Sequence, residues 1–176
     1  MLSKSDGINV ISFARFFFFG SRDVWFVVSL PFCLENSLNL DFGEIEGFLG
    51  LWVIGYGIVQ GLAPTLSKLW GKRSSPGVST IRVWGAFLTF IPGLISIALW
   101  REGGLTVAIK VGLISFGIVF AMSSSIHSYM VLAYSDLENV SLNVGFYYMA
   151  NAAGRLTATL LSGFLFMLGK TASHGL

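Results

Sequence analysis

The sequence predicts an all-α fold: a polytopic transmembrane helical bundle with about five membrane spans. Hydrophobic residues make up 54% of the 176 residues and charged residues only 11%, whereas a soluble domain carries about 25% charged residues. The mean hydropathy of the chain is +0.75. A chain with so few charges cannot cover its own surface in water, so lipid is expected to surround most of it.

Long apolar runs supply the spans. A hydrocarbon core about 30 Å thick takes about 20 helical residues at a rise of about 1.5 Å each. Five runs reach this length: Ile8–Leu34, Ile45–Pro64, Ile81–Trp100, Leu105–Ala133 and Val144–Leu168. The segments between them are short and polar, so residues 1–176 are expected to form a single transmembrane domain. The third run has no ionisable residue after Arg82 until the run ends, which predicts a peripheral, lipid-facing helix.

Positive residues in the short loops predict the orientation, because such residues are retained in the cytoplasm. The segment after the second run holds Lys68, Lys72, Arg73 and Arg82, whereas the loop Glu35–Glu44 holds no Lys or Arg. We therefore expect the basic loop and the N-terminus to be cytoplasmic and the Glu35–Glu44 loop to be external.

Two arginines in the first run are the first candidate site residues. Arg15 and Arg22 are seven residues apart, close to two helical turns, so they share one face of the helix. A cationic stripe facing an aqueous cavity would suit an anionic substrate. The alternatives are that Arg15 reaches the cytoplasmic interface and that Arg22 pairs with an acid on another helix. Asp23 points about 100° away from Arg22 on an ideal helix, so it need not neutralise Arg22. Asp23 is also a candidate for proton coupling.

The fifth run carries a polar stripe at helical spacing. Its members are Tyr147, Asn151, Arg155 and Thr159, followed by Ser162. A face of this kind cannot contact lipid, so it faces either a cavity or a neighbouring helix. Asn151 and Arg155 are therefore candidate substrate ligands or members of an interhelical seam. Ala150 and Gly154 would let a partner helix approach closely.

The second and fourth runs give weaker signals. Tyr56 and Gln60 are four residues apart and are expected first to pack, and second to contact a cavity. Gly57 and Gly61 form a GxxxG pair, which predicts helix packing. His127 lies among serines; it is either a hydrogen-bonded structural residue or a group that shuttles protons.

Motifs of other function classes are absent from the sequence. There is no HExxH, GxSxG, P-loop or Rossmann glycine pattern, so neither an enzyme nor a cofactor site is expected. The single cysteine, Cys33, excludes a CxxC metal site, and no metal ligand set is expected. The basic residues are scattered and do not form a nucleic-acid surface.

The order of these features resembles the C-terminal half of a major facilitator superfamily transporter, with the basic loop Leu66–Gly77 in the place of that family's loop motif. Four runs resemble the ArsJ family of organoarsenical efflux permeases. They are SRDVWFVVSLPFCL (Ser21–Leu34), LWVIGYGIVQGLAP (Leu51–Pro64), IHSYMVLAYSD (Ile126–Asp136) and GFYYMANAAGRLTATLLSG (Gly145–Gly163).

The resemblance implies a permease of the bacterial inner membrane that exports 1-arseno-3-phosphoglycerate, a polyanion suited to guanidinium ligands. It also implies a partner, an N-terminal six-helix half, and one further C-terminal helix, so the chain is expected to be a fragment or a split product. The alternatives are a facilitator half for another phosphorylated or carboxylated metabolite, and a membrane remnant that transports nothing.

The orientation can be tested with single cysteines in a Cys33→Ser background. We expect an impermeant thiol reagent outside the cell to label Asn39→Cys and not Ser74→Cys, because the basic loop is retained inside. Labelling of Ser74→Cys alone would reverse the orientation.

Overall fold

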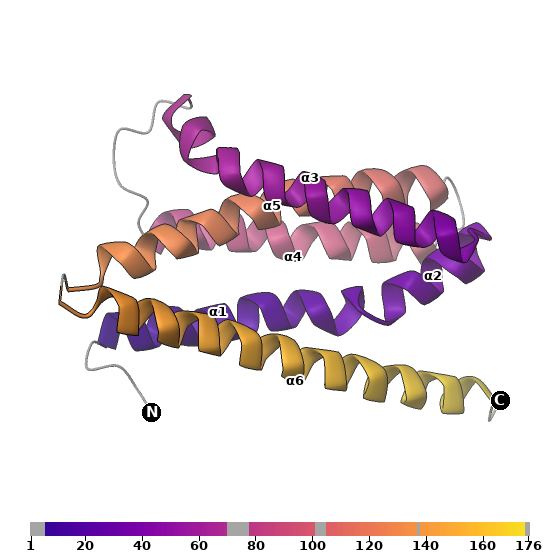
Figure 1. The fold of residues 1–176 in the computed structure, drawn as a ribbon. Coiled ribbons are helices and arrows are strands. Elements are labelled where there is room, and N and C mark those ends of the chain that lie inside the picture. The colour runs from indigo at the N-terminus through magenta and orange to yellow at the C-terminus, as the bar shows by residue number, and fades with distance from the viewer. Residues whose placement is uncertain (1–5, 70–77, 101–104, 137, 175–176) are drawn as a thin grey trace. The chain divides into compact units, whose positions relative to one another are not determined.

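The computed structural model describes residues 6–69, 78–100, 105–136 and 138–174, and every regular element in these ranges is an α-helix (Figure 1). The helices are α1 (Asp6–Phe26), α2 (Ser29–Leu38), α3 (Phe42–Leu69), α4 (Val78–Trp100), α5 (Leu105–Ala133) and α6 (Val140–His174). The predicted all-α class is confirmed.

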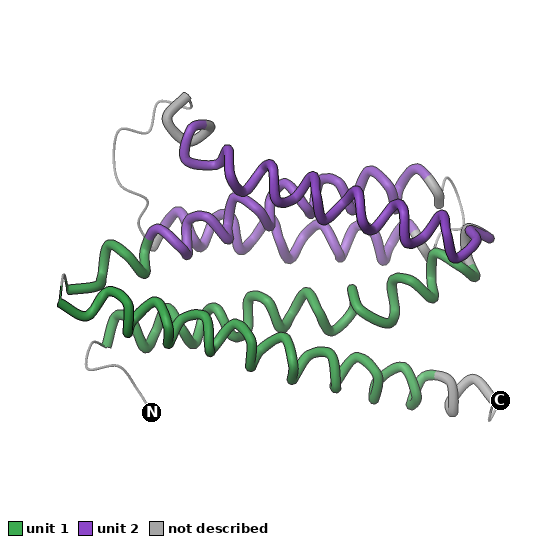
Figure 2. Tube along the Cα trace, in the orientation of Figure 1, with its two compact units in different colours: residues 1–36, 130–176 green, residues 37–129 purple. Residues whose placement is uncertain are grey.

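Five spans in the described ranges are long and apolar enough to cross a membrane, which confirms the predicted number. They are Asp6–Asn36, Phe42–Thr65, Ser79–Ala98, Val107–Ala133 and Val140–Gly169. The chain is therefore, by helix length and composition, a multi-pass membrane protein. It divides into two compact units (Figure 2), residues 1–36 with 130–176 and residues 37–129.

The first span differs from its prediction, because it is not one continuous helix. α1 ends at Phe26, a turn occupies Val27 and Val28, and α2 begins at Ser29. Proline has no backbone N–H, so Pro31 cannot donate to the carbonyl of Val27. The missing hydrogen bond accounts for the interruption at this point.

The start of α3 follows from two acidic residues. The Asp41 carboxylate accepts a hydrogen bond from the Glu44 backbone N–H at 2.8 Å, and the Glu44 carboxylate accepts one from the Asp41 N–H at 3.1 Å. This reciprocal pair satisfies donors that the first helical turn leaves open. Asn39, just before it, has a φ of 51° and turns the chain between α2 and α3.

In the unit of residues 1–36 and 130–176, α1 and α6 pack closely and run in the same direction. Gly154 lies directly against the backbone of Phe16, where a Cβ atom would collide with the Phe16 carbonyl group. One turn further along α1, Gly20 lies against Gly154 and Ala158. The prediction that Gly154 permits close helix approach is confirmed.

In the unit of residues 37–129, α3 packs on α5 through an aromatic face. The Trp52 indole N–H donates to the Leu113 carbonyl at 2.7 Å, and the Trp52 ring lies against Gly117. The prediction that Gly57 and Gly61 mediate packing is wrong for the described chain: a Cβ atom at either position would meet nothing within 4 Å. The bulky ring of Trp52, seated on a glycine of α5, sets the contact instead.

α4 matches the prediction of a peripheral helix, since no residue of its most apolar stretch within Ser79–Ala98 is buried. Several residues on which the orientation prediction depends lie outside the described residues. These are Lys72, Arg73 and Ser74; the side chain of Lys68 is also not described.

The close approach of α1 and α6 can be tested at Gly154. We expect Gly154→Ala to destabilise the folded chain by about 1–3 kcal/mol, the usual result of forcing an extra methyl group into a packed contact. Gly163→Ala on the same helix is the control, because its Cβ meets nothing within 4 Å. Reversible unfolding in detergent micelles measures both, and equal stabilities would contradict the contact.

Candidate functional site

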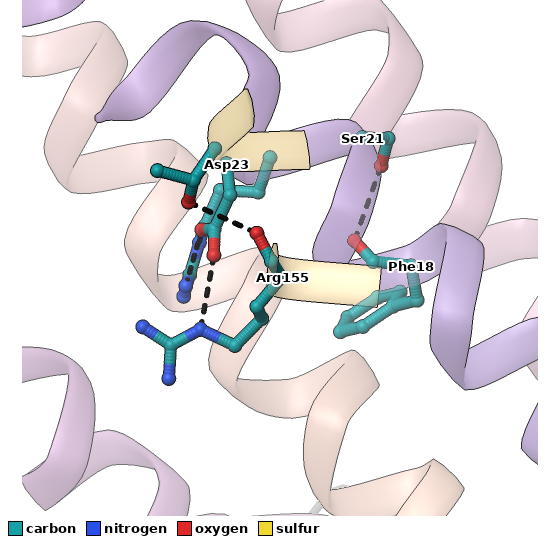
Figure 3. Close-up of polar contacts among 6 residues, drawn as sticks. Phe18, Ser21, Asp23 and Arg155 are labelled. Carbon is teal, nitrogen blue, oxygen red and sulfur yellow. Dashed lines mark hydrogen bonds and ion pairs between the residues drawn. The ribbon is translucent and has the colours of Figure 1, made fainter. Parts of the chain in front are cut away.

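A buried carboxylate on α1 joins two arginines. The Asp23 Oδ1 atom accepts a hydrogen bond from Arg22 Nε at 2.6 Å, and Oδ2 accepts one from Arg155 Nε of α6 at 2.9 Å (Figure 3). The Asp23 side chain is 2% exposed, whereas that of Arg155 is 55% exposed. Each carboxylate oxygen therefore holds one guanidinium group, and the pair formed with Arg155 ties α6 to α1.

The cluster lies at the middle of both spans. The centre of Asp6–Asn36 falls at Ser21, two residues before Asp23, and the centre of Val140–Gly169 falls between Gly154 and Arg155. At this depth a bare charge is expensive, so ionisable side chains pair with one another or face water. The depth makes Asp23 and Arg155 the foremost functional candidates in the described chain.

Asp23 is the acid that neutralises Arg22, which the geometry of an ideal helix did not require. On an ideal helix adjacent residues diverge by about 100°, but the arginine side chain is long enough to fold back along its own helix. Arg22 is only 8% exposed, and its guanidinium lies against the ring of Phe19 at 4.9 Å. The acid that pairs with Arg22 is thus its own neighbour and not a residue of another helix.

Arg15 is buried instead of reaching the interface. It is 3% exposed, and its guanidinium lies over the Phe19 ring at 4.2 Å and the Tyr147 ring of α6 at 4.7 Å. Aromatic faces stabilise cations, the more so where water is excluded. Because Arg15 and Arg22 both contact Phe19, the prediction that they share one face of α1 is confirmed.

The polar stripe of α6 serves partly as a seam and partly as an exposed face. Tyr147 and Ser162 are fully buried, whereas Arg155 and Thr159 are exposed. Asn151 is intermediate, and its buried Oδ1 atom has no hydrogen-bond partner among the described residues. Tyr147 and Ser162 therefore belong to a seam, whereas the cavity alternative stays a prediction for Arg155 and Thr159.

The remaining predicted site residues belong to the other unit. Tyr56 stacks on Trp52 and contacts Phe120, and the Gln60 backbone carbonyl accepts a hydrogen bond from the Ser125 hydroxyl at 3.0 Å. Tyr56 thus packs between α3 and α5, as was first expected for it, whereas the expectation for the Gln60 side chain stays a prediction. His127 is buried, at 5% exposure.

The sequence analysis missed Phe19 and the Phe16 backbone as parts of the site. Phe19 lies between Arg15 and Arg22 in the sequence and contacts both guanidinium groups. Because it is one of four consecutive phenylalanines, the sequence does not indicate which ring makes these contacts. Among the described residues, no three His, Cys, Asp or Glu side chains gather to hold a metal ion.

No family model, curated protein or solved structure matches the chain. The resemblance to the facilitators and to the organoarsenical permeases therefore stays a prediction from the sequence runs that carry it.

The role of Asp23 as counter-ion predicts suppression by a second substitution. Asp23→Asn leaves two guanidinium groups without a carboxylate and is expected to destabilise the fold by about 3–5 kcal/mol. Adding Arg22→Gln removes one of those charges and should restore much of the folded protein.

Size-exclusion chromatography of detergent extracts measures the folded amounts. Ser21→Ala is the matched control, since its hydroxyl donates to the Phe18 carbonyl of its own helix, one turn away, at 3.1 Å (Figure 3). A double variant less abundant than Asp23→Asn would contradict the pairing of Arg22 with Asp23.

Proposed function

We propose that the chain is one half of a secondary transporter that exports a small organic anion. The observation that carries the proposal is an excess of guanidinium groups within two packed spans. The segments Ile8–Leu34 and Val144–Leu168 hold three arginines and one aspartate, a formal charge of +2. Charge that a protein retains inside the bilayer is a functional signal by default, because it is costly to insert.

An oxyanion is the ligand that this charge favours. Guanidinium is planar, stays ionised and offers paired donors that match carboxylate and phosphate groups. Arg155 is the best candidate for direct contact, because its side chain is 55% exposed while Arg15 and Arg22 are buried. The buried Arg15 and Arg22 then add positive charge near the site without contacting the ligand.

Transport accounts for the depth of the cluster better than a structural role alone. Secondary transporters place substrate sites near the bilayer midplane, at the interface of two helical repeats. Asp23 and Arg155 lie close to the centres of their spans. In this proposal the partner is an N-terminal six-helix half, whose surface would close the other side of the site.

The finer proposal concerns the substrate. The resemblance to organoarsenical permeases favours 1-arseno-3-phosphoglycerate, exported across the bacterial inner membrane during arsenate detoxification. This molecule carries an acyl arsenate group and a phosphate group, both oxyanions, which agrees with the excess of arginine. A facilitator half for another phosphorylated or carboxylated metabolite would use the same arginines.

The test is arsenate resistance in a bacterium that lacks arsenical efflux and expresses a glyceraldehyde-3-phosphate dehydrogenase. We expect resistance when the chain is co-expressed with the N-terminal half and the last helix of an organoarsenical permease, and not when the chain or those parts are expressed alone. Arg155→Gln should abolish resistance, whereas Thr157→Ala, on another face of α6, should retain it.

Three results would overturn parts of this proposal. Resistance from the chain alone would remove the need for a partner half. Resistance retained by Arg155→Gln would remove Arg155 as a ligand. Export of a phosphate ester without arsenate resistance would keep the transporter and replace the substrate.

A further inference from the structure

The guanidinium of Arg155 is held at one edge and open at the other. Its Nε atom donates to Asp23 Oδ2 at 2.9 Å, and its two terminal nitrogens point away from that carboxylate (Figure 3). Among the described residues, no hydrogen bond or ion pair reaches those terminal nitrogens. The side chain is 55% exposed, although it sits at the middle of a 30-residue span.

An open guanidinium at this depth cannot face hydrocarbon. Isolated charges at the bilayer centre persist only beside a partner or a water-filled cavity. Asp23 satisfies one nitrogen of Arg155, so two nitrogens still require water or an anion. The face of α6 that carries Arg155 must therefore be hydrated, and Thr159, one turn further on, shares that face.

Arg22 explains why the charge of Arg155 is not cancelled. The Oδ1 atom of Asp23 accepts a hydrogen bond from Arg22, which is 8% exposed and lies against Phe19. Two guanidinium groups share one carboxylate, so one positive charge remains in excess. Because Arg22 is buried, the excess charge is accessible only at the exposed end of Arg155.

We propose that Asp23 is a positioning residue: it fixes Arg155 through Nε so that the terminal nitrogens face a hydrated path and bind one oxyanion group at the bilayer midplane. This inference rests on the proposed function and specifies its site. Two parallel N–H donors match two oxygens of a carboxylate or phosphate, but not a spherical halide. The site should thus select organic oxyanions over chloride.

The hydrated face can be measured by thiol labelling in membrane vesicles of both orientations, in a Cys33→Ser background. Thr159→Cys lies on the Arg155 face, and Leu160→Cys is the matched control, exposed at almost the same depth but directed about 140° from Arg155. We expect a water-soluble thiosulfonate to label Thr159→Cys at least about tenfold faster, because thiols react as hydrated thiolates. Equal rates would overturn the hydrated face.

The ligand contact is measured by protection, with 3-phosphoglycerate as the probe. It should slow the labelling of Thr159→Cys, whereas sodium chloride at the same ionic strength should not. Arg155→Lys, which keeps the charge and loses the paired donors, should abolish this protection. Protection that survives Arg155→Lys, or that chloride provides equally, would overturn the oxyanion site.

The positioning role is tested with Arg22→Gln/Asp23→Asn, which removes one charge of each sign. We expect Thr159→Cys still to be labelled faster than Leu160→Cys by the same ratio. The concentration of 3-phosphoglycerate that gives half-maximal protection should rise about tenfold, as for the loss of one charge-assisted contact. Unchanged protection would overturn the role of Asp23. Asp23→Glu is the second variant and should keep part of the protection. If Thr159→Cys and Leu160→Cys are labelled at equal rates in both variants, Asp23 serves the fold alone and its positioning role is refuted.

These measurements report binding and not export. Protection without arsenate resistance and without export of any phosphate ester would refute the proposed transport and leave the oxyanion site in place. Resistance without protection would refute the site and leave transport in place.

Discussion

The packing of α1 on α6 depends on one buried carboxylate. Asp23 sits near the centre of its span and holds Arg22 through one oxygen and Arg155 through the other. Without it, two guanidinium groups would lie at bilayer depth with no opposite charge, a state that membranes strongly disfavour. The same carboxylate joins α1 to α6, so charge compensation and helix association are the same interaction.

Close backbone packing makes that interaction possible. Gly154 lies against the Phe16 backbone, which brings α6 near enough for the adjacent Arg155 to reach Asp23. Within a bilayer no hydrophobic driving force brings helices together, so their association depends on the close packing that small residues permit. The aromatic rings of Phe19 and Tyr147 then surround Arg15 on the same pair of helices. Packing and electrostatics therefore reinforce each other along the α1–α6 seam.

The sequence predicted the spans well, because apolar length alone sets them: the fourth run, Leu105–Ala133, coincides with α5. It predicted less of the site. The break after Phe26 depends on one proline, and the glycines Gly57 and Gly61 match a packing motif that the described chain does not use. The pairing of Arg22 with Asp23 depends on a side-chain conformation, and the link from Asp23 to Arg155 depends on the register of α1 against α6. The periodicity of the sequence predicts neither of these.

The central claim, that Asp23 binds α6 through Arg155 inside the membrane, is tested most directly by a double-mutant cycle. Asp23→Asn, Arg155→Gln and the double variant are compared with the parent chain by reversible unfolding in lipid-containing micelles. We expect a coupling free energy of about 1 kcal/mol or more between the two positions, within the range for residues in direct contact. Additive effects of the two substitutions would contradict the claim.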